Sequence, residues 1–268
     1  MIFENDGAVH KKEKYYTNTF SMSDFKKFLC VQKNLSGATV DNHLRNLKVF
    51  QQSNLNVQEF MEQVKITKSN ATYKNYLSAL KIYFRDFLKQ PEIIEDFKFP
   101  AIGFKPKILP NKKQLITFYD ALPLPKYRII FIMLGSSGLR VSELLSAKID
   151  NAQRMIIPQS HDGSTKNAWI SFYNEETAEI YDEKPFNTSR NTISHVFKDV
   201  ADKTGINMSA QTLRSVFARE MSKAGVQDRY IDCFCGRTPQ SVLARHYSDY
   251  SPEVLKEIYS KANIKILG

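Results

Sequence analysis

The stretch GLRVSELL at residues 138–145 places Arg140 at the start of a predicted short helix over about 141–147. At such a position a guanidinium and the first backbone N–H groups of the helix can face one anion together. Glu143 falls in the first turn, where an acid either supports Arg140 or only interacts with the helix dipole. The segment therefore predicts an anion site on a helical scaffold.

A predicted β-hairpin follows this helix. Segments 154–158 and 167–172 are rich in β-forming residues and flank a turn around residues 161–164. Lys166 stands at the end of that turn, from which its ammonium group can reach into a groove. The hairpin thus adds a second candidate cation.

Two more arginines and a tyrosine lie at the ends of later predicted helices. Arg214 is near the start of a helix over 211–224, one turn after Gln211. Arg237 follows a helix over 227–235, and Tyr247 comes ten residues later. Each alone has an ordinary explanation, such as a surface ion pair or a packed ring. Only the whole set indicates a site.

Helical periodicity organises the rest of the chain. Before Pro91, helical segments are predicted at 24–32, around 40–47, at 56–66 and at 69–90. Others are predicted at 111–121, 126–135, 188–204, 239–246 and 252–263. The sequence therefore predicts a mainly α fold with a small β-hairpin or sheet. Its parts would be a helical domain over 1–95, a linker over 96–110 and a second domain over 111–268.

The predicted linker and the start of the helix after it are strongly basic. The stretch from Phe97 to Tyr119 holds five lysines and no acid, and its prolines favour an extended backbone over much of it. The lysines are Lys98, Lys105, Lys107, Lys112 and Lys113. Such a strap either runs along a phosphate backbone or is a solvated linker. We expect the first.

Charge and composition restrict the class of protein. The 268 residues carry a net charge of +10, with 15 basic and 11 acidic residues up to Phe104 and therefore 23 and 17 after it. Two basic parts suit a protein that holds a polyanion from two sides, although solubility alone also explains such charge. The 42% hydrophobic and 25% charged content is that of an ordinary soluble globular protein.

Several other classes are not indicated. The longest apolar run, 129–134, is too short to span a membrane, and the acidic N-terminus lacks a secretory signal. Three cysteines without C-x-x-C spacing and five histidines without H-x-x-x-H spacing predict no disulfide framework and no metal site. Phosphate-loop and dinucleotide-binding glycine motifs do not occur. We expect a cytoplasmic protein without cofactors.

The order and spacing of these motifs resemble the tyrosine recombinase (phage-type integrase) family. The resemblance covers most of the chain and implies that 1–95 is a core-binding (DNA-binding) domain and 111–268 a catalytic domain. It is carried by GLRVSELL at 138–145, the hairpin Lys166, TLRSVFA at 212–218 and HYSDYSPEVL at 246–255. It implies site-specific DNA cleavage and rejoining through a 3′-phosphotyrosyl intermediate, for integration or excision of a mobile element such as a viral genome. It also implies double-stranded DNA and a dimer or tetramer on that DNA as partners.

The resemblance assigns a role to each candidate residue. Tyr247 would be the nucleophile, and Lys166 would protonate the leaving 5′-oxygen. Arg140 and Arg214 would bind the non-bridging phosphate oxygens, with Glu143 supporting Arg140. Tyr250 is the alternative nucleophile.

Two positions depart from the family pattern. Gln211 stands where most members have histidine, and an amide does not titrate near neutral pH. Arg237 stands where histidine or tryptophan is usual, and a third guanidinium could bond the phosphate there. These departures resemble the divergent integrases of archaeal viruses and plasmids.

Two other functions remain open on the sequence. A type IB topoisomerase uses the same Arg–Lys–Arg–Tyr chemistry without synapsis, and a DNA-binding protein with a decayed site would explain Gln211. The C-terminal segment 264–267 is too apolar for a solvated tail. We expect it to dock on an adjacent protomer, with folding back on its own domain as the alternative.

Overall fold

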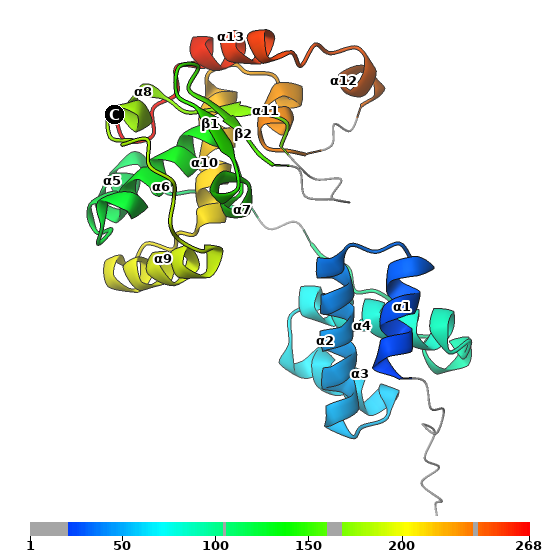
Figure 1. The fold of residues 1–268 in the computed structure, drawn as a ribbon. Coiled ribbons are helices and arrows are strands. Elements are labelled where there is room, and N and C mark those ends of the chain that lie inside the picture. Colours follow the sequence, from blue (N-terminus) through cyan, green and yellow to red (C-terminus); the bar gives the residue numbers. More distant parts are fainter. Residues whose placement is uncertain (1–20, 104–105, 160–167, 238–240) are drawn as a thin grey trace, which may run out of the picture. The chain divides into compact units, whose positions relative to one another are not determined.

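A computed structural model describes residues 21–103, 106–159, 168–237 and 241–268 (Figure 1). The candidates Lys105 and Lys166 lie outside the described residues. The chain divides into two compact units, Met1–Lys105 and Pro106–Gly268.

The first unit is a bundle of helices. They are α1 (Met22–Val31), α2 (Gly37–Ser53), α3 (Val57–Thr67) and α4 (Asn70–Lys81), followed by a π-helical turn (Ile82–Phe87) and a 3₁₀ turn (Pro91–Ile93). Ser21 caps α1 and Asn56 caps α3, and each forms a capping box with the acid three residues later. The helix predicted over 69–90 is therefore α-helical only up to Lys81 and then widens into the π turn.

Aromatic side chains fill the core of this unit. The Phe25 ring meets Tyr83 edge to face, with ring centroids 5.1 Å apart, and Phe50 meets Phe84 in the same way at 6.0 Å. Phe25 and Phe84 are fully buried. Residues of the α4–π segment thus pack against both α1 and α2, which holds the bundle together.

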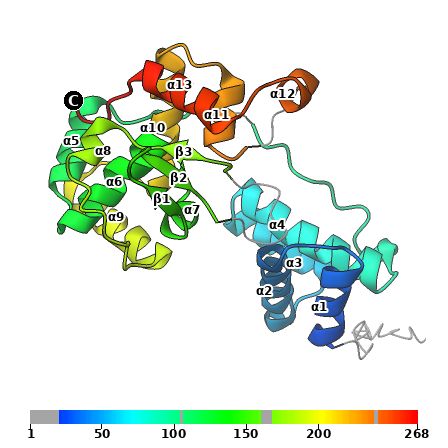
Figure 2. The same cartoon turned by 45° about the horizontal axis from the view of Figure 1, so that its top comes forward.

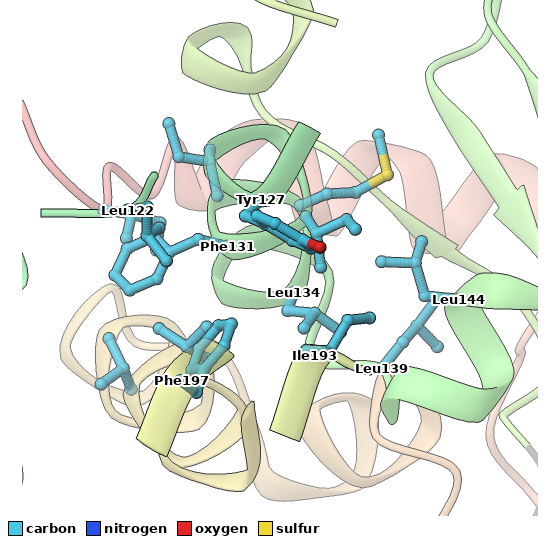
Figure 3. Packing of buried hydrophobic residues seen from close by; sticks show 14 of the residues in the cluster. Leu122, Tyr127, Phe131, Leu134, Leu139, Leu144, Ile193 and Phe197 are labelled. Carbon is cyan, nitrogen blue, oxygen red and sulfur yellow. The ribbon is translucent and has the colours of Figure 1, made fainter. Parts of the chain in front are cut away.

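The second unit is mainly helical. Its helices are α5 (Lys112–Asp120), α6 (Pro125–Ser137), α7 (Val141–Leu145), α8 (Glu175–Ala178), α9 (Arg190–Thr204), α10 (Ala210–Lys223), α11 (Asp228–Phe234), α12 (Val242–His246) and α13 (Pro252–Ala262). Helix α6 is buried over nearly its whole length, as its apolar sequence predicts. Figure 3 shows its Phe131 and Leu134 packed with Phe197 and Ile193 of α9 and with Leu144 of α7. This core fixes α7, whose first residues carry the site.

A three-stranded antiparallel sheet completes this unit, in the order β1 (Lys148–Asp150), β2 (Met155–Ile157), β3 (Ser171–Phe172). Ile149 pairs with Ile156, and Ile156 pairs with Ser171. The predicted mainly α fold with a small sheet is confirmed. Both hairpin strands are shorter than predicted, and β1 was not predicted, because three residues give too little periodicity to distinguish a strand from a loop.

The C-terminal segment folds back on its own unit, so the expectation that it docks on an adjacent protomer is wrong. Ile266 is buried, and the Glu176 carboxylate accepts hydrogen bonds from the backbone N–H groups of Ile266, Leu267 and Gly268. The Asn174 amide donates to the Ile264 carbonyl at 3.1 Å. Both views place the C-terminus beside α8 (Figures 1 and 2).

Candidate active site

Arg214 is the centre of the candidate site. It lies in the second turn of α10 and its side chain is only 3% exposed. One guanidinium nitrogen donates to the Gly138 carbonyl at 2.9 Å, and the other donates to the Cys235 carbonyl. The side chain therefore ties the loop before α7 to the end of α11.

Glu143 brings a second arginine to the same place. Its Oε1 lies 2.5 Å from Nη1 of Arg140, and its Oε2 accepts a hydrogen bond from the Arg140 backbone N–H at 2.7 Å. The same Oε2 lies 3.7 Å from Nη1 of Arg214. One buried carboxylate thus faces two guanidiniums, which leaves a net positive charge at the head of α7.

Burial lowers the pKa of Arg214, and the neighbouring positive charges of Arg140 and Arg237 lower it further. An arginine titrates so far above neutral pH that it stays charged at this position. A buried, charged group costs solvation free energy unless it is paired, and Glu143 and the two carbonyls provide the pairing. Because these contacts already hold the Arg214 side chain in place, its positive charge can attract a bound anion without further ordering of the side chain.

Arg237 lies beside this cluster and is tied to α11. Its backbone N–H donates to the Asp232 carbonyl at 2.9 Å, and its guanidinium pairs with the Asp232 carboxylate at 3.1 Å. The side chain is about half exposed. The charges of Arg140 and Arg237 both act on Arg214, so three arginines from separate segments lie near one another. Among the described residues, Glu143 pairs with Arg140 and Arg214.

The cysteines near the arginines are poor candidates for nucleophiles. Burial raises the pKa of the Cys233 thiol to about 11 and also raises that of Cys235. Both thiols are therefore protonated near neutral pH. Cys235 contributes its backbone carbonyl to the site.

Tyr247 is the exposed tyrosine of the C-terminal region. It follows α12, is 76% exposed, and its hydroxyl has no hydrogen-bond partner among the described residues. By contrast, the Tyr250 hydroxyl donates to the Ala244 carbonyl at 2.6 Å. The Tyr259 hydroxyl is buried and donates to Ser136, and burial raises its pKa. Within the described part of the chain, no contact joins Tyr247 to an arginine of the site.

Gln211 and the described strap lysines lie on the surface. Gln211 is exposed in the first turn of α10, one turn before Ser215. Lys98, Lys107, Lys112 and Lys113 are exposed, and Lys107 donates to the Ser215 hydroxyl at 2.8 Å.

Several residues that support the site were not found from the sequence. Ser171 of β3 donates to the Ser137 carbonyl at 2.6 Å, and Tyr259 donates to the neighbouring Ser136 carbonyl at 2.8 Å. These bonds hold the end of α6, directly before Gly138. Their acceptors are backbone carbonyls of residues far away in the sequence, so no motif predicts them.

The described residues contain no group of three or more His, Cys, Asp or Glu side chains that could hold a metal ion. No helix among them is long and apolar enough to cross a membrane.

The mainly helical unit with its three arginines defines the class of protein, a tyrosine recombinase. Residues 107–263 match the family described as archaeal phage integrase, so the chain belongs to that family.

Two relatives and one solved structure are similar to this chain. Tyrosine recombinase XerA from Pyrococcus furiosus is 27% identical over 184 residues, which are 59% of this chain and 64% of the relative. XerA from Thermococcus onnurineus is 26% identical over 184 residues, again 59% of this chain and 65% of the relative. The match thus spans less than two thirds of these relatives. Lambda integrase (residues 75–356) bound to DNA shares the fold with a TM-score of 0.66 at 15% identity, over 84% of this chain and 94% of that one.

Proposed function

We propose that this protein is a site-specific DNA recombinase, or integrase, that cleaves and rejoins DNA strands through a 3′-phosphotyrosyl intermediate. Its role is the integration or excision of a mobile element such as a viral genome. The observation that carries the proposal is the pair of guanidiniums, Arg140 and Arg214, held around one buried carboxylate. This arrangement fits a phosphate diester with two non-bridging oxygens.

The chemistry follows from charge. In-line attack by a tyrosine hydroxyl builds negative charge on the non-bridging oxygens of the phosphate. Each guanidinium at about 4 Å contributes about 4 kcal/mol of raw attraction at an effective dielectric constant near 20. Even partial use of this attraction is worth a hundredfold in rate or more, since 1.36 kcal/mol is tenfold. Arg140 and Arg214 can thus do in this site what a metal ion does in many nucleases.

Tyr247 is the proposed nucleophile. Solvent water takes the proton of the Tyr247 hydroxyl, and attack of the resulting oxygen on phosphorus forms the phosphotyrosine bond. The bond from phosphorus to the 5′-oxygen breaks, and this oxygen leaves as a hydroxyl after taking a proton from Lys166. Of the three tyrosines near the C-terminus, Tyr247 is the one with an exposed hydroxyl. The bond energy is kept in the phosphotyrosine, so rejoining needs no ATP.

The partners follow from this reaction. The substrate is double-stranded DNA, gripped by Arg237 and the strap lysines in addition to the two central arginines. Exchange of strands between two duplexes requires several copies of the chain, a dimer or tetramer assembled on DNA. Such a protein works in the host cytosol or nucleoid.

Covalent trapping on a nicked suicide duplex tests the proposal. A library of arm sequences supplies the duplexes, and a denaturing gel shows the protein–DNA adduct. We expect an adduct with the unchanged protein, whereas a decayed DNA-binding protein would bind and form none. Relaxation of supercoiled plasmid without strand exchange would instead indicate a topoisomerase.

Tyr247→Phe should abolish the adduct and leave DNA affinity within a few-fold. The variant loses one hydroxyl, whereas affinity comes from phosphate contacts. Tyr250→Phe is the matched control, because that hydroxyl is bonded to the Ala244 carbonyl, and it should still form adduct. An adduct that survives in Tyr247→Phe would exclude Tyr247 as the nucleophile.

A further inference from the structure

One face of α10 carries three polar side chains at intervals of four residues, Gln211, Ser215 and Arg219. Residues four apart lie above one another on a helix, about 5–6 Å between neighbours. Arg214, next to Ser215, points into the protein instead, where it meets Gly138 and Cys235. The face therefore begins at the site and leads away from it.

The strap is bonded to this face. The Lys107 ammonium donates to the Ser215 hydroxyl at 2.8 Å, and the Arg219 guanidinium donates to the Pro110 carbonyl at 2.8 Å. Segment 107–110 therefore runs beside α10, with Lys107 at the end nearest Gln211. The two hydrogen bonds hold the Lys107 ammonium about one helical turn from Gln211. Its partner Ser215 directly follows Arg214 in the sequence.

The Gln211 amide carries no charge and does not titrate. The ammonium group of Lys107 supplies a positive charge next to it. An ammonium group has three N–H donors, and Ser215 accepts one of them, so two remain for oxygens of a bound anion. The side chain is exposed, so its ammonium is accessible to DNA.

We propose that Lys107 is an active-site residue, which binds an oxygen of the scissile phosphate or of its immediate neighbour beside Gln211. Ser215 is its positioning residue, because it acts only by orienting the ammonium. The proposal rests on the proposed strand-transfer function and adds a fifth cation to Arg140, Lys166, Arg214 and Arg237. It distinguishes Lys107 from the other strap lysines, for which the described residues show no bond to α10.

Single-turnover cleavage of the trapping duplex, at saturating DNA, tests this role. Lys107→Ala should slow cleavage about 10- to 100-fold, and Lys107→Arg should recover part of that loss because it restores the charge. Ser215→Ala should slow cleavage less, about 3- to 10-fold. The double variant should be no slower than Lys107→Ala, since the serine acts through the lysine. Lys198→Ala, an exposed lysine on α9, is the control and should cleave at the unchanged rate.

Chemically modified DNA identifies the phosphate. A methylphosphonate at the scissile position, or at either flanking position, removes the charge of one phosphate at a time. On one of these duplexes the neutral phosphate is the one that Lys107 binds. On that duplex Lys107→Ala should no longer slow cleavage relative to the unchanged protein. A cost that persists unchanged on all three duplexes would overturn the proposal.

Two failures are distinguishable. If the unchanged protein forms no adduct with any duplex, the proposed function fails and the inference falls with it. If it forms adduct, and Lys107→Ala cleaves as fast as Lys198→Ala at saturating DNA, the inference alone is wrong. Independent losses in the double variant would contradict the role given to Ser215.

Discussion

At the scale of single residues, Arg214 combines a structural role with the chemical role proposed for it. Its guanidinium joins two backbone carbonyls from separate segments and faces Glu143. Arg140 has a different position, because it is only partly buried and its pairing with Glu143 is local in sequence. The two arginines should therefore respond differently to substitution, with Arg214 affecting stability as well as rate.

Arg214→Ala should lower the cleavage rate a thousandfold or more, because it removes a charge that matters most in the transition state. It should also reduce the free energy of unfolding by about 3 kcal/mol, since Glu143 and two carbonyls lose a buried partner. Single-turnover cleavage and urea unfolding measure the two effects. Arg214→Lys, which keeps the charge, is the comparison that separates them.

Gln211→Ala should cost only about tenfold in cleavage rate, the equivalent of one hydrogen bond of about 1–1.5 kcal/mol. The cleavage rate of the unchanged protein and of Gln211→Ala should be measured from pH 5.5 to 9.5. The two pH–rate profiles should not differ by a titration step near pH 6.5, because the Gln211 amide does not titrate there. A loss as large as that of Arg214→Ala would show that the amide has a chemical role.

The sequence predicts local residue pairs better than distant ones. Arg140 and Glu143 are three residues apart on one helix, so their proximity follows from helical geometry. The Arg214 contacts with Gly138 and Cys235 join residues 76 and 21 positions apart. Because both acceptors are backbone carbonyls, no side-chain type at those positions reveals them.

At the scale of elements, the turn between α6 and α7 sets the position of Arg140. Gly138 ends α6 with φ +69°, and its carbonyl accepts a hydrogen bond from the Arg214 guanidinium. A Cβ atom at this position would lie 2.3 Å from the Phe217 ring of α10, which is fully buried. The glycine is therefore required both by its backbone conformation and by the close approach of α10.

Gly138→Ala should destabilise the second unit by about 3 kcal/mol, the sum of a left-handed backbone and an overpacked core. Gly205→Ala is the matched control, because Gly205 has φ +67° and no atom within 4 Å of the position of a Cβ. It should cost about 1 kcal/mol. Trp169 is the single tryptophan of the chain and lies in this unit, so its fluorescence during urea unfolding reports the difference.

The sequence predicts that the C-terminal segment is buried, because its residues are apolar. It does not predict which surface covers the segment. In the structure Ile266 lies against Gly135 of α6. The backbone N–H groups of residues 266–268 donate hydrogen bonds to the Glu176 carboxylate. The choice between its own unit and a neighbour depends on where a complementary carboxylate lies, which periodicity does not reveal.

Ile266→Ala should lower the free energy of unfolding of this unit by about 3 kcal/mol, because it leaves a cavity next to α6. Ile108→Ala is the control, since Ile108 is 95% exposed, and should change stability by less than about 0.5 kcal/mol. Urea unfolding followed by Trp169 fluorescence measures both. Equal stabilities of the two variants would contradict the contact of the tail with its own unit.

At the scale of the whole molecule, the strap is not a uniformly free linker. At its first end, Phe99 receives the Lys81 ammonium over its ring at 5.5 Å. At the other end, Lys107 and Pro110 are bonded to α10. The sequence predicts an extended basic connection from its prolines and lysines, but not these contacts, because each depends on a partner in a folded unit.

DNA binding should therefore fall steeply with salt. Each phosphate contact releases counterions and contributes about −0.9 to the slope of log K against log salt. With about six contacts from the strap and both units, the slope should be about −5 or steeper. Replacing Lys98, Lys107, Lys112 and Lys113 together with glutamine should flatten it by about 3 to 4, since up to four contacts are lost. Fluorescence anisotropy with a labelled duplex between 50 and 300 mM salt measures both slopes. A slope near −1 for the unchanged protein would mean that the positive charge of the two units is general surface charge, and that DNA is held by the arginine site alone.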